Sequence, residues 1–171
     1  MRSSLRGFLT TPHNNPVAGI AVRFAAPTGP VIGNFLNPIV FRNGADAGMI
    51  ALNNHIFRNI ADGFNIISST APPLVPGQVI SAISQYTGIQ RNITIQSITD
   101  SGLGLNNIVR TTGRAIPGDS GGLVFSRVPN TPNQVFAIGM IFAFDDYPFG
   151  TNMRFTRADF VNRELGVNFL P

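Results

Sequence analysis

Short apolar runs bounded by turn residues dominate this chain. Pro, Gly and Asn separate them, and most runs are too short for a helix, which is the pattern of β-strands joined by turns. Around Ile93 and Ile95 apolar and polar positions alternate, as in a half-buried strand. The first series of predicted strands comprises Phe8–Thr10, Val17–Phe24, Val31–Phe35, Ile39–Phe41 and Gly48–Leu52. The second series comprises Gln78–Gln85, Asn92–Thr99, Asn107–Thr112, Gly122–Phe125, Val135–Phe144 and Gly150–Phe155.

A Pro- and Ser-rich segment, residues 68–77, divides the two series and is the strongest linker signal in the chain. We therefore expect an all-β protein with one unit at 1–67 and another at 78–171, which together form one domain. Near the end the period changes. Thr156 with Asp159 three residues later predicts a helix N-cap, an apolar stripe follows, and Gly166 is a helix stop.

Composition narrows the classes of function. The 12 basic residues are all Arg, scattered singly, and the net charge is only +4, which disfavours nucleic-acid binding. No apolar run approaches the ~20 residues that span a membrane, and no signal peptide is visible. The absence of Cys excludes disulfides and slightly favours an intracellular, viral or bacterial setting. With no Cys and two His, neither a metal nor an organic cofactor is implied.

The most informative motif is the sequence GDSGG at residues 118–122, which precedes an apolar run. Gly118 allows a sharp turn, so that the amides of Gly118 and Ser120 point at one spot where an oxyanion would sit. Gly121 and Gly122 would leave room for a substrate backbone. Asp119 would face the other way and need a buried cationic partner. An ordinary glycine-rich turn is the alternative.

Two further segments carry candidate chemistry. His13 ends the apolar stretch that begins at residue 6, whereas the other histidine, His55, lies in a polar, turn-like context. Asp46 leads into an apolar strand. Taken singly, each has another interpretation: His13 as a surface or core residue, and Asp46 as a solvated turn residue after Asn43.

Together, and in the order His13, Asp46, Ser120, these motifs resemble the chymotrypsin-like (trypsin-fold) serine proteases. The resemblance implies two six-stranded antiparallel β-barrels and a short C-terminal helix. It implies that Ser120 is the nucleophile, that His13 is the base and that Asp46 orients His13, in a cleft between the barrels. The amides of Gly118 and Ser120 would form the oxyanion hole.

Two features depart from that family. His13 comes after fewer residues than usual, so we expect a first barrel that is short at its start, completed by an upstream segment or a second chain. The chain also lacks the Ile-Val-Gly-Gly start whose amine pairs with the Asp beside the nucleophile in zymogen-activated members. An internal Arg is therefore the expected partner of Asp119.

By resemblance, the substrate-binding residues would be Arg114, Phe142, Ala143 and Phe144. Arg114 lies six residues before Ser120, at the pocket floor, and could favour an acidic side chain. It could also be a surface residue or the partner of Asp119. Phe142 and Phe144 could narrow the pocket, so a small apolar preference is equally open. A preference for Lys or Arg is disfavoured.

The leading hypothesis is a serine endopeptidase that acts on protein or peptide substrates, including its own precursor or a few partners. The alternatives are a catalytically inactive, protease-like peptide-binding module and a structural β protein with a chance GDSGG motif.

Overall fold

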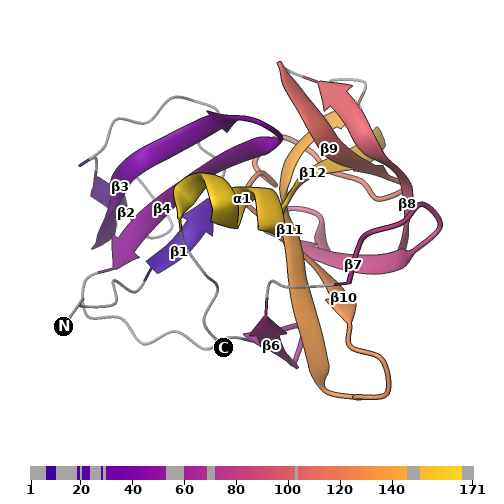
Figure 1. Cartoon of the computed structure of the whole chain (residues 1–171). Coiled ribbons are helices and arrows are strands. Elements are labelled where there is room, and N and C mark those ends of the chain that lie inside the picture. The colour runs from indigo at the N-terminus through magenta and orange to yellow at the C-terminus, as the bar shows by residue number, and fades with distance from the viewer. Residues whose placement is uncertain are drawn as a thin grey trace.

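The all-β prediction is confirmed by a computed structural model, whose described part folds into two β-sheets and one helix (Figure 1). The described residues are 7–10, 19, 21–23, 28, 30–52, 60–68, 72–102, 104–145 and 151–166.

The first sheet is antiparallel and has the order β1-β4-β3-β2. Its strands are β1 (Gly7–Thr10), β2 (Ala21–Arg23), β3 (Val31–Arg42) and β4 (Ala45–Leu52). Asn43 (φ 52°) and Gly44 (φ 80°) join β3 to β4, and positive φ at both positions is the type I′ hairpin that matches strand twist.

The strand β3 corrects one expectation. Two separate strands were predicted on either side of Pro38, but the structure has one strand whose pairing with β4 shifts register between Phe35 and Ile39. Proline has no N–H to give to the ladder, so the strand accommodates Pro38 as an irregularity instead of ending there.

The second sheet contains a closed, six-stranded antiparallel barrel. The order β10-β7-β8-β9-β12-β11 returns to its start because β10 also pairs with β11. Every pair within this ring is antiparallel. The strands are β7 (Val79–Ser84), β8 (Gly88–Gly102), β9 (Leu105–Thr111), β10 (Leu123–Arg127), β11 (Gln134–Asp145) and β12 (Thr151–Arg157). Closure removes the exposed edges of the barrel.

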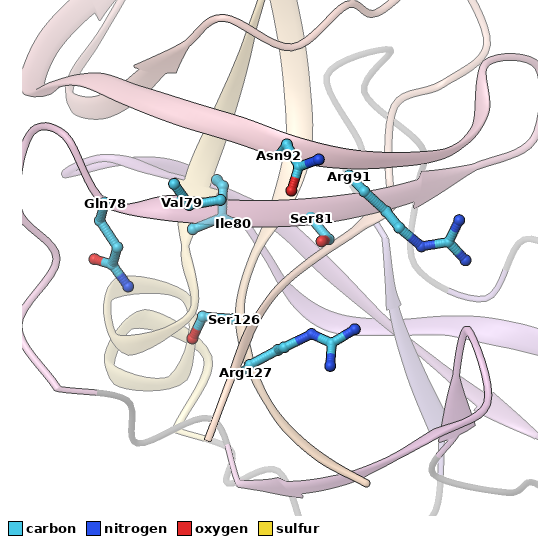
Figure 2. A pocket seen from close by; sticks show the side chains of 8 residues that line it. All are labelled: Gln78, Val79, Ile80, Ser81, Arg91, Asn92, Ser126 and Arg127. Carbon is cyan, nitrogen blue, oxygen red and sulfur yellow. The ribbon is translucent and has the colours of Figure 1, made fainter. Parts of the chain in front are cut away.

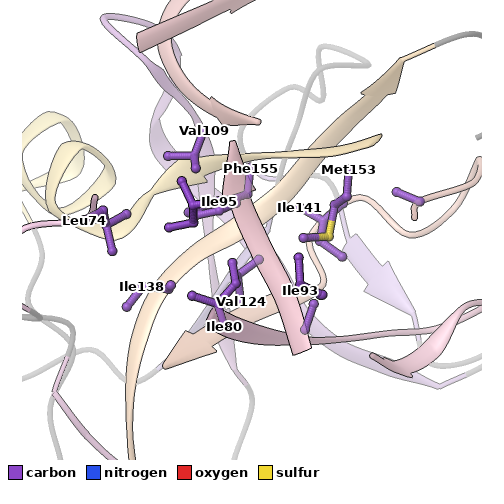
Figure 3. Packing of buried hydrophobic residues seen from close by; sticks show 12 residues of the cluster. Leu74, Ile80, Ile93, Ile95, Val109, Val124, Ile138, Ile141, Met153 and Phe155 are labelled. Atoms are coloured by element: carbon purple, nitrogen blue, oxygen red, sulfur yellow. The ribbon is translucent and has the colours of Figure 1, made fainter. Parts of the chain in front are cut away.

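The interior of this barrel is the main hydrophobic core (Figure 3). On β8, Ile93 and Ile95 are both buried and the residue between them is not, as the alternating pattern predicted. The cluster consists of Leu74, Ile80, Ala82, Ile93, Ile95, Val109, Ala115, Val124, Ile138, Ile141, Met153 and Phe155. Such a packed core gives the loops at the barrel end a rigid base.

A small hairpin, β5 (Ile60–Ala61) and β6 (Phe64–Ser68), was not predicted from the sequence. Its turn is Asp62–Gly63, with φ of 51° and 80°. An Asp-Gly pair is a strong hairpin signal, so the sequence contained a sign of this hairpin. Strand β6 pairs in parallel with β11, so residues 60–68 join the sheet of the second barrel.

The helix α1 (Ala158–Leu165) ends at Gly166 (φ 64°) as predicted, but the N-cap prediction is wrong. Thr156 is part of β12, and its Oγ1 donates to the carbonyl of Met140 (3.4 Å). The helix therefore begins at Ala158, one residue later than predicted, with Arg157 as a cap that makes no side-chain cap hydrogen bond. In Figure 1 the helix lies between the first sheet and β11. No helix of the described residues is long and apolar enough to cross a membrane.

Candidate functional site

Ser120 lies in the loop 112–122, between β9 and β10 of the closed barrel. The amide of Asp119 donates to the carbonyl of Ile116 (3.0 Å), which closes a turn with Pro117 and Gly118 at its centre. A φ of 96° at Gly118 identifies a type II turn, which requires glycine there. The ring of Tyr86 also occupies the place where a Cβ on Gly118 would stand. The structure thus contains the predicted sharp turn at Gly118. Both the positive φ and the packing of Tyr86 favour glycine at this position.

Beyond Ser120 the loop is fastened to β11. The Gly121 amide donates to the Ile141 carbonyl and the Ile141 amide donates to the Gly122 carbonyl, both at 2.8 Å. A Cβ on Gly122 would stand 2.7 Å from Ser84 Cβ. The absence of a side chain at Gly122 thus lets β7 pack against this position.

The hydroxyl of Ser120 points toward the same strand. Its Oγ lies 3.5 Å from the carbonyl oxygen of Phe142, a long hydrogen bond, and the side chain of Ser120 is partly buried. The nucleophile candidate is therefore held at the beginning of β10 and beside β11.

The carboxylate of Asp119 is 1% exposed and pairs with no Arg of the described residues, so the expected Arg partner is not found there. Its Oδ1 accepts from the amides of Tyr86 (2.9 Å) and Thr87 (3.2 Å), and its Oδ2 accepts from the amide of Ile116 (3.0 Å). Burial acts to raise the pKa of Asp119, but these three bonds and one from Ser84 outweigh it and lower the pKa below its ordinary value. Aligned backbone donors replace a cation here.

Asp46 lies on β4, directly after the β3–β4 hairpin, and its exposed fraction is 0%. Its neighbours Ala45 and Ala47 pack with α1 and with Met140 of β11. The solvated-turn interpretation is therefore wrong: Asp46 is buried where the first sheet meets the second barrel.

A short path of contacts joins Asp46 to Ser120. Phe41 is the cross-strand partner of Asp46, and the ring of Phe41 lies 6.3 Å from that of Phe142, tilted by 47°. The carbonyl of Phe142 is the acceptor for Ser120 Oγ. The two rings thus bring β3 of the first sheet into contact with β11 of the second barrel, whereas His13 and His55 lie outside the described residues.

The predicted substrate-binding residues occupy two elements. Arg114 is exposed, and its backbone N–H and C=O are both held by the side chain of Gln90. Phe142 is 1% exposed and packs against Leu105 and Ile108. Ala143 and Phe144 lie on β11, where they pair with Arg154 and Met153 of β12.

A hollow of about 400 Å³ lies over β7, β8 and the far end of β10 (Figure 2). Its two cations are engaged: Arg91 donates to both carboxylate oxygens of Asp62, and the guanidinium of Arg127 stacks 4.5 Å above the ring of Phe64. These contacts fasten the β5–β6 hairpin to the barrel. Within the described part of the chain, no cluster of His, Asp and Glu could hold a metal ion.

Comparison with known proteins supports the architecture. No protein-family model and no curated protein matches the chain. Among solved structures, a Nocardiopsis protease is 24% identical, with a TM-score of 0.72 over 99% of this chain and 88% of its own. A glutamic acid specific serine protease, described as using a histidine triad in substrate binding, is 21% identical, with a TM-score of 0.71 over 98% and 88%. Thermobifida fusca protease A is 22% identical, with a TM-score of 0.67 over 98% and 86%. The chain thus has the chymotrypsin-like double-barrel fold of these serine proteases.

Proposed function

We propose that the chain is a serine endopeptidase that cleaves peptide bonds in protein substrates, including its own precursor or a few partner proteins. The observation that carries this proposal is a contact between the two sheets: Phe41, the cross-strand partner of the buried Asp46, lies beside Phe142, whose carbonyl accepts from Ser120 Oγ. A buried carboxylate is costly and is retained where its charge has a use.

In this proposal Ser120 attacks the scissile carbonyl and His13 accepts the Ser120 proton, which it later gives to the leaving amine. Asp46 orients His13 and stabilises its cation. The amides of Gly118 and Ser120 stabilise the oxyanion, a contribution of about 3 kcal/mol per donor. The turn and the clamped Asp119 support this role, because they hold the backbone before substrate arrives.

The substrate backbone would pair with the strand β11 at Phe142, Ala143 and Phe144, as an added strand. For the residue before the scissile bond we propose an acidic side chain, recognised by Arg114. Arg114 is exposed and makes no ion pair with any described residue, so a substrate carboxylate would be its partner. The similar structure of a glutamic acid specific protease supports this choice, because it has the same fold with that specificity.

The test of catalysis is covalent labelling with a fluorophosphonate probe. We expect the wild-type chain to be labelled, Ser120→Ala and His13→Ala to lose labelling, and the controls Ser101→Ala and His55→Ala to keep it. Ser101 is an exposed serine on β8. A well-folded wild-type chain without labelling would favour the inactive peptide-binding module instead.

The specificity proposal has its own test. Peptides that differ only in Glu, Leu or Arg before the cleaved bond are compared on the wild type and on Arg114→Gln. We expect the wild type to prefer Glu, and the variant to lose about tenfold in kcat/KM for the Glu peptide alone. Equal hydrolysis of the Leu peptide by the wild type would support the small or apolar preference.

A further inference from the structure

The side chain of Gln90 makes an unusual two-point contact with the backbone of Arg114. Its Nε2 donates to the Arg114 carbonyl (2.6 Å) and its Oε1 accepts from the Arg114 amide (2.8 Å). One side-chain amide thus satisfies both polar backbone groups of a residue that belongs to no strand. This contact holds the position of Arg114 as a ladder partner would.

Gln90 itself has a firm base. It belongs to β8 and pairs with Ala82 of β7, a fully buried residue of the barrel core. Its Nε2 also donates to Thr87 Oγ1 (3.0 Å), and that oxygen lies 2.7 Å from Ser84 Oγ. The side-chain orientation is therefore set from within the β7–β8 hairpin.

The same hairpin holds the other end of the segment. Thr87 and Tyr86 donate their amides to Asp119, whose second oxygen accepts from Ile116. The residues from Arg114 to Asp119 are thus fixed at two points by one hairpin, through Gln90 at the beginning and through Asp119 at the end. Loop segments without a ladder need such partners, because each unpaired buried backbone group is costly.

We propose that Gln90 is a positioning residue for substrate selection: it fixes the backbone of Arg114, and so the place where the guanidinium of Arg114 meets the side chain before the scissile bond. This inference rests on the proposed function. Gln90 affects the binding of that side chain through Arg114 and does not affect the chemistry at Ser120, whose turn is held separately through Asp119.

The test compares Gln90→Met, which keeps the length and loses both hydrogen bonds, with Gln96→Met on the same strand. Gln96 is exposed and makes no side-chain hydrogen bond with a described residue. For Gln90→Met we expect hydrogen exchange at the Arg114 amide to accelerate about tenfold, because that amide loses its acceptor. We expect KM for a Glu peptide to rise about tenfold, with kcat and the fluorophosphonate labelling rate within about twofold of wild type.

A second variant keeps the inference testable where Gln90→Met folds poorly. Gln90→Glu retains an acceptor for the Arg114 amide but sets a carboxylate oxygen against the Arg114 carbonyl, so we expect retained amide protection together with a rise in KM. If a labelled wild type and Gln90→Met show the same Arg114 exchange and the same KM, the positioning role is wrong and the proposed function stands. If the wild-type chain is neither labelled nor active, the proposed function fails and the positioning role fails with it.

Discussion

The β3–β4 hairpin, which carries Asp46, and the loop 112–122, which carries Ser120, solve one problem in two ways. Each holds a polar residue that the proposed mechanism uses. The hairpin satisfies its backbone through its own ladder and a type I′ turn at Asn43–Gly44. The loop has no ladder over most of its length. It relies on the side chain of Gln90 from the β7–β8 hairpin and on its own Asp119, which accepts from backbone amides of that hairpin. Local signals therefore describe the hairpin, whereas distant contacts hold the loop.

The largest effect should come from Gly118→Ala in the loop. The added methyl group is strained at a φ of 96° and would clash with the ring of Tyr86. In the proposed mechanism it also displaces an oxyanion donor. We expect fluorophosphonate labelling to slow by about 100-fold or more. Gly77→Ala is the control, because Gly77 has a similar φ of 85° with nothing within 4 Å of its missing Cβ. Equal losses of labelling in the two variants would contradict the assignment of the turn.

Asp119→Asn should be the next largest change. The amide can accept at one atom only, so at least one of the backbone donors now bound at Oδ1 and Oδ2 loses its partner. We expect the free energy of unfolding, measured in denaturant, to fall by about 2–3 kcal/mol. The matched control Asp159→Asn removes an exposed carboxylate that pairs with Arg157, and should cost about 1 kcal/mol or less. Similar costs would mean that the buried hydrogen bonds contribute no more than a surface pair.

The pH dependence of the free energy of unfolding should also report on Asp119. The pKa of Asp119 in the native state lies below its ordinary value of 3.8, so the unfolded chain binds more protons in the range below that value. The stabilisation is therefore complete well above pH 3.8 and is lost as the pH falls through the native pKa. Asp119→Asn should remove this part of the acid sensitivity in unfolding curves taken at several pH values. If Asp119→Asn loses stability at acid pH as steeply as the wild type, the role given to the Asp119 carboxylate is wrong.

Two glycines in hairpin turns allow a matched comparison with a smaller expected effect on stability. Gly44 and Gly63 share a φ of 80° in type I′ turns. A Cβ on Gly44 would stand 2.7 Å from Phe160 and 2.8 Å from the Asn106 carbonyl, whereas nothing lies within 4 Å of one on Gly63. We expect Gly44→Ala to lower the free energy of unfolding by about 2 kcal/mol more than Gly63→Ala. Equal losses of stability in the two variants would mean that Phe160 and the Asn106 carbonyl move away from the added methyl group at little cost.

The smallest effect should come from the ion pair between this hairpin and the helix. Arg42 Nε lies 3.0 Å from Glu164 Oε2, and the side chain of Arg42 is 68% exposed. Water and salt screen such a pair, so Arg42→Gln should shift the unfolding midpoint only slightly and only at low salt. A large shift that persists in high salt would indicate that packing of Arg42, and not its charge, joins the hairpin to the helix.

The sequence by itself determined the all-β class, most of the strands, the C-terminal helix with its Gly166 stop, and the turn at Gly118. Each of these depends on residues close in the chain, through alternation, turn chemistry or a positive φ. Tertiary structure alone decided that backbone amides and not an Arg hold Asp119, that Gln90 holds Arg114, and that β7 fills the space at Gly122. It also decided that Asp46 is buried beside α1. These contacts join segments far apart in sequence. Every residue except proline also has the same backbone N–H, so the residue types do not show which amides will act as donors.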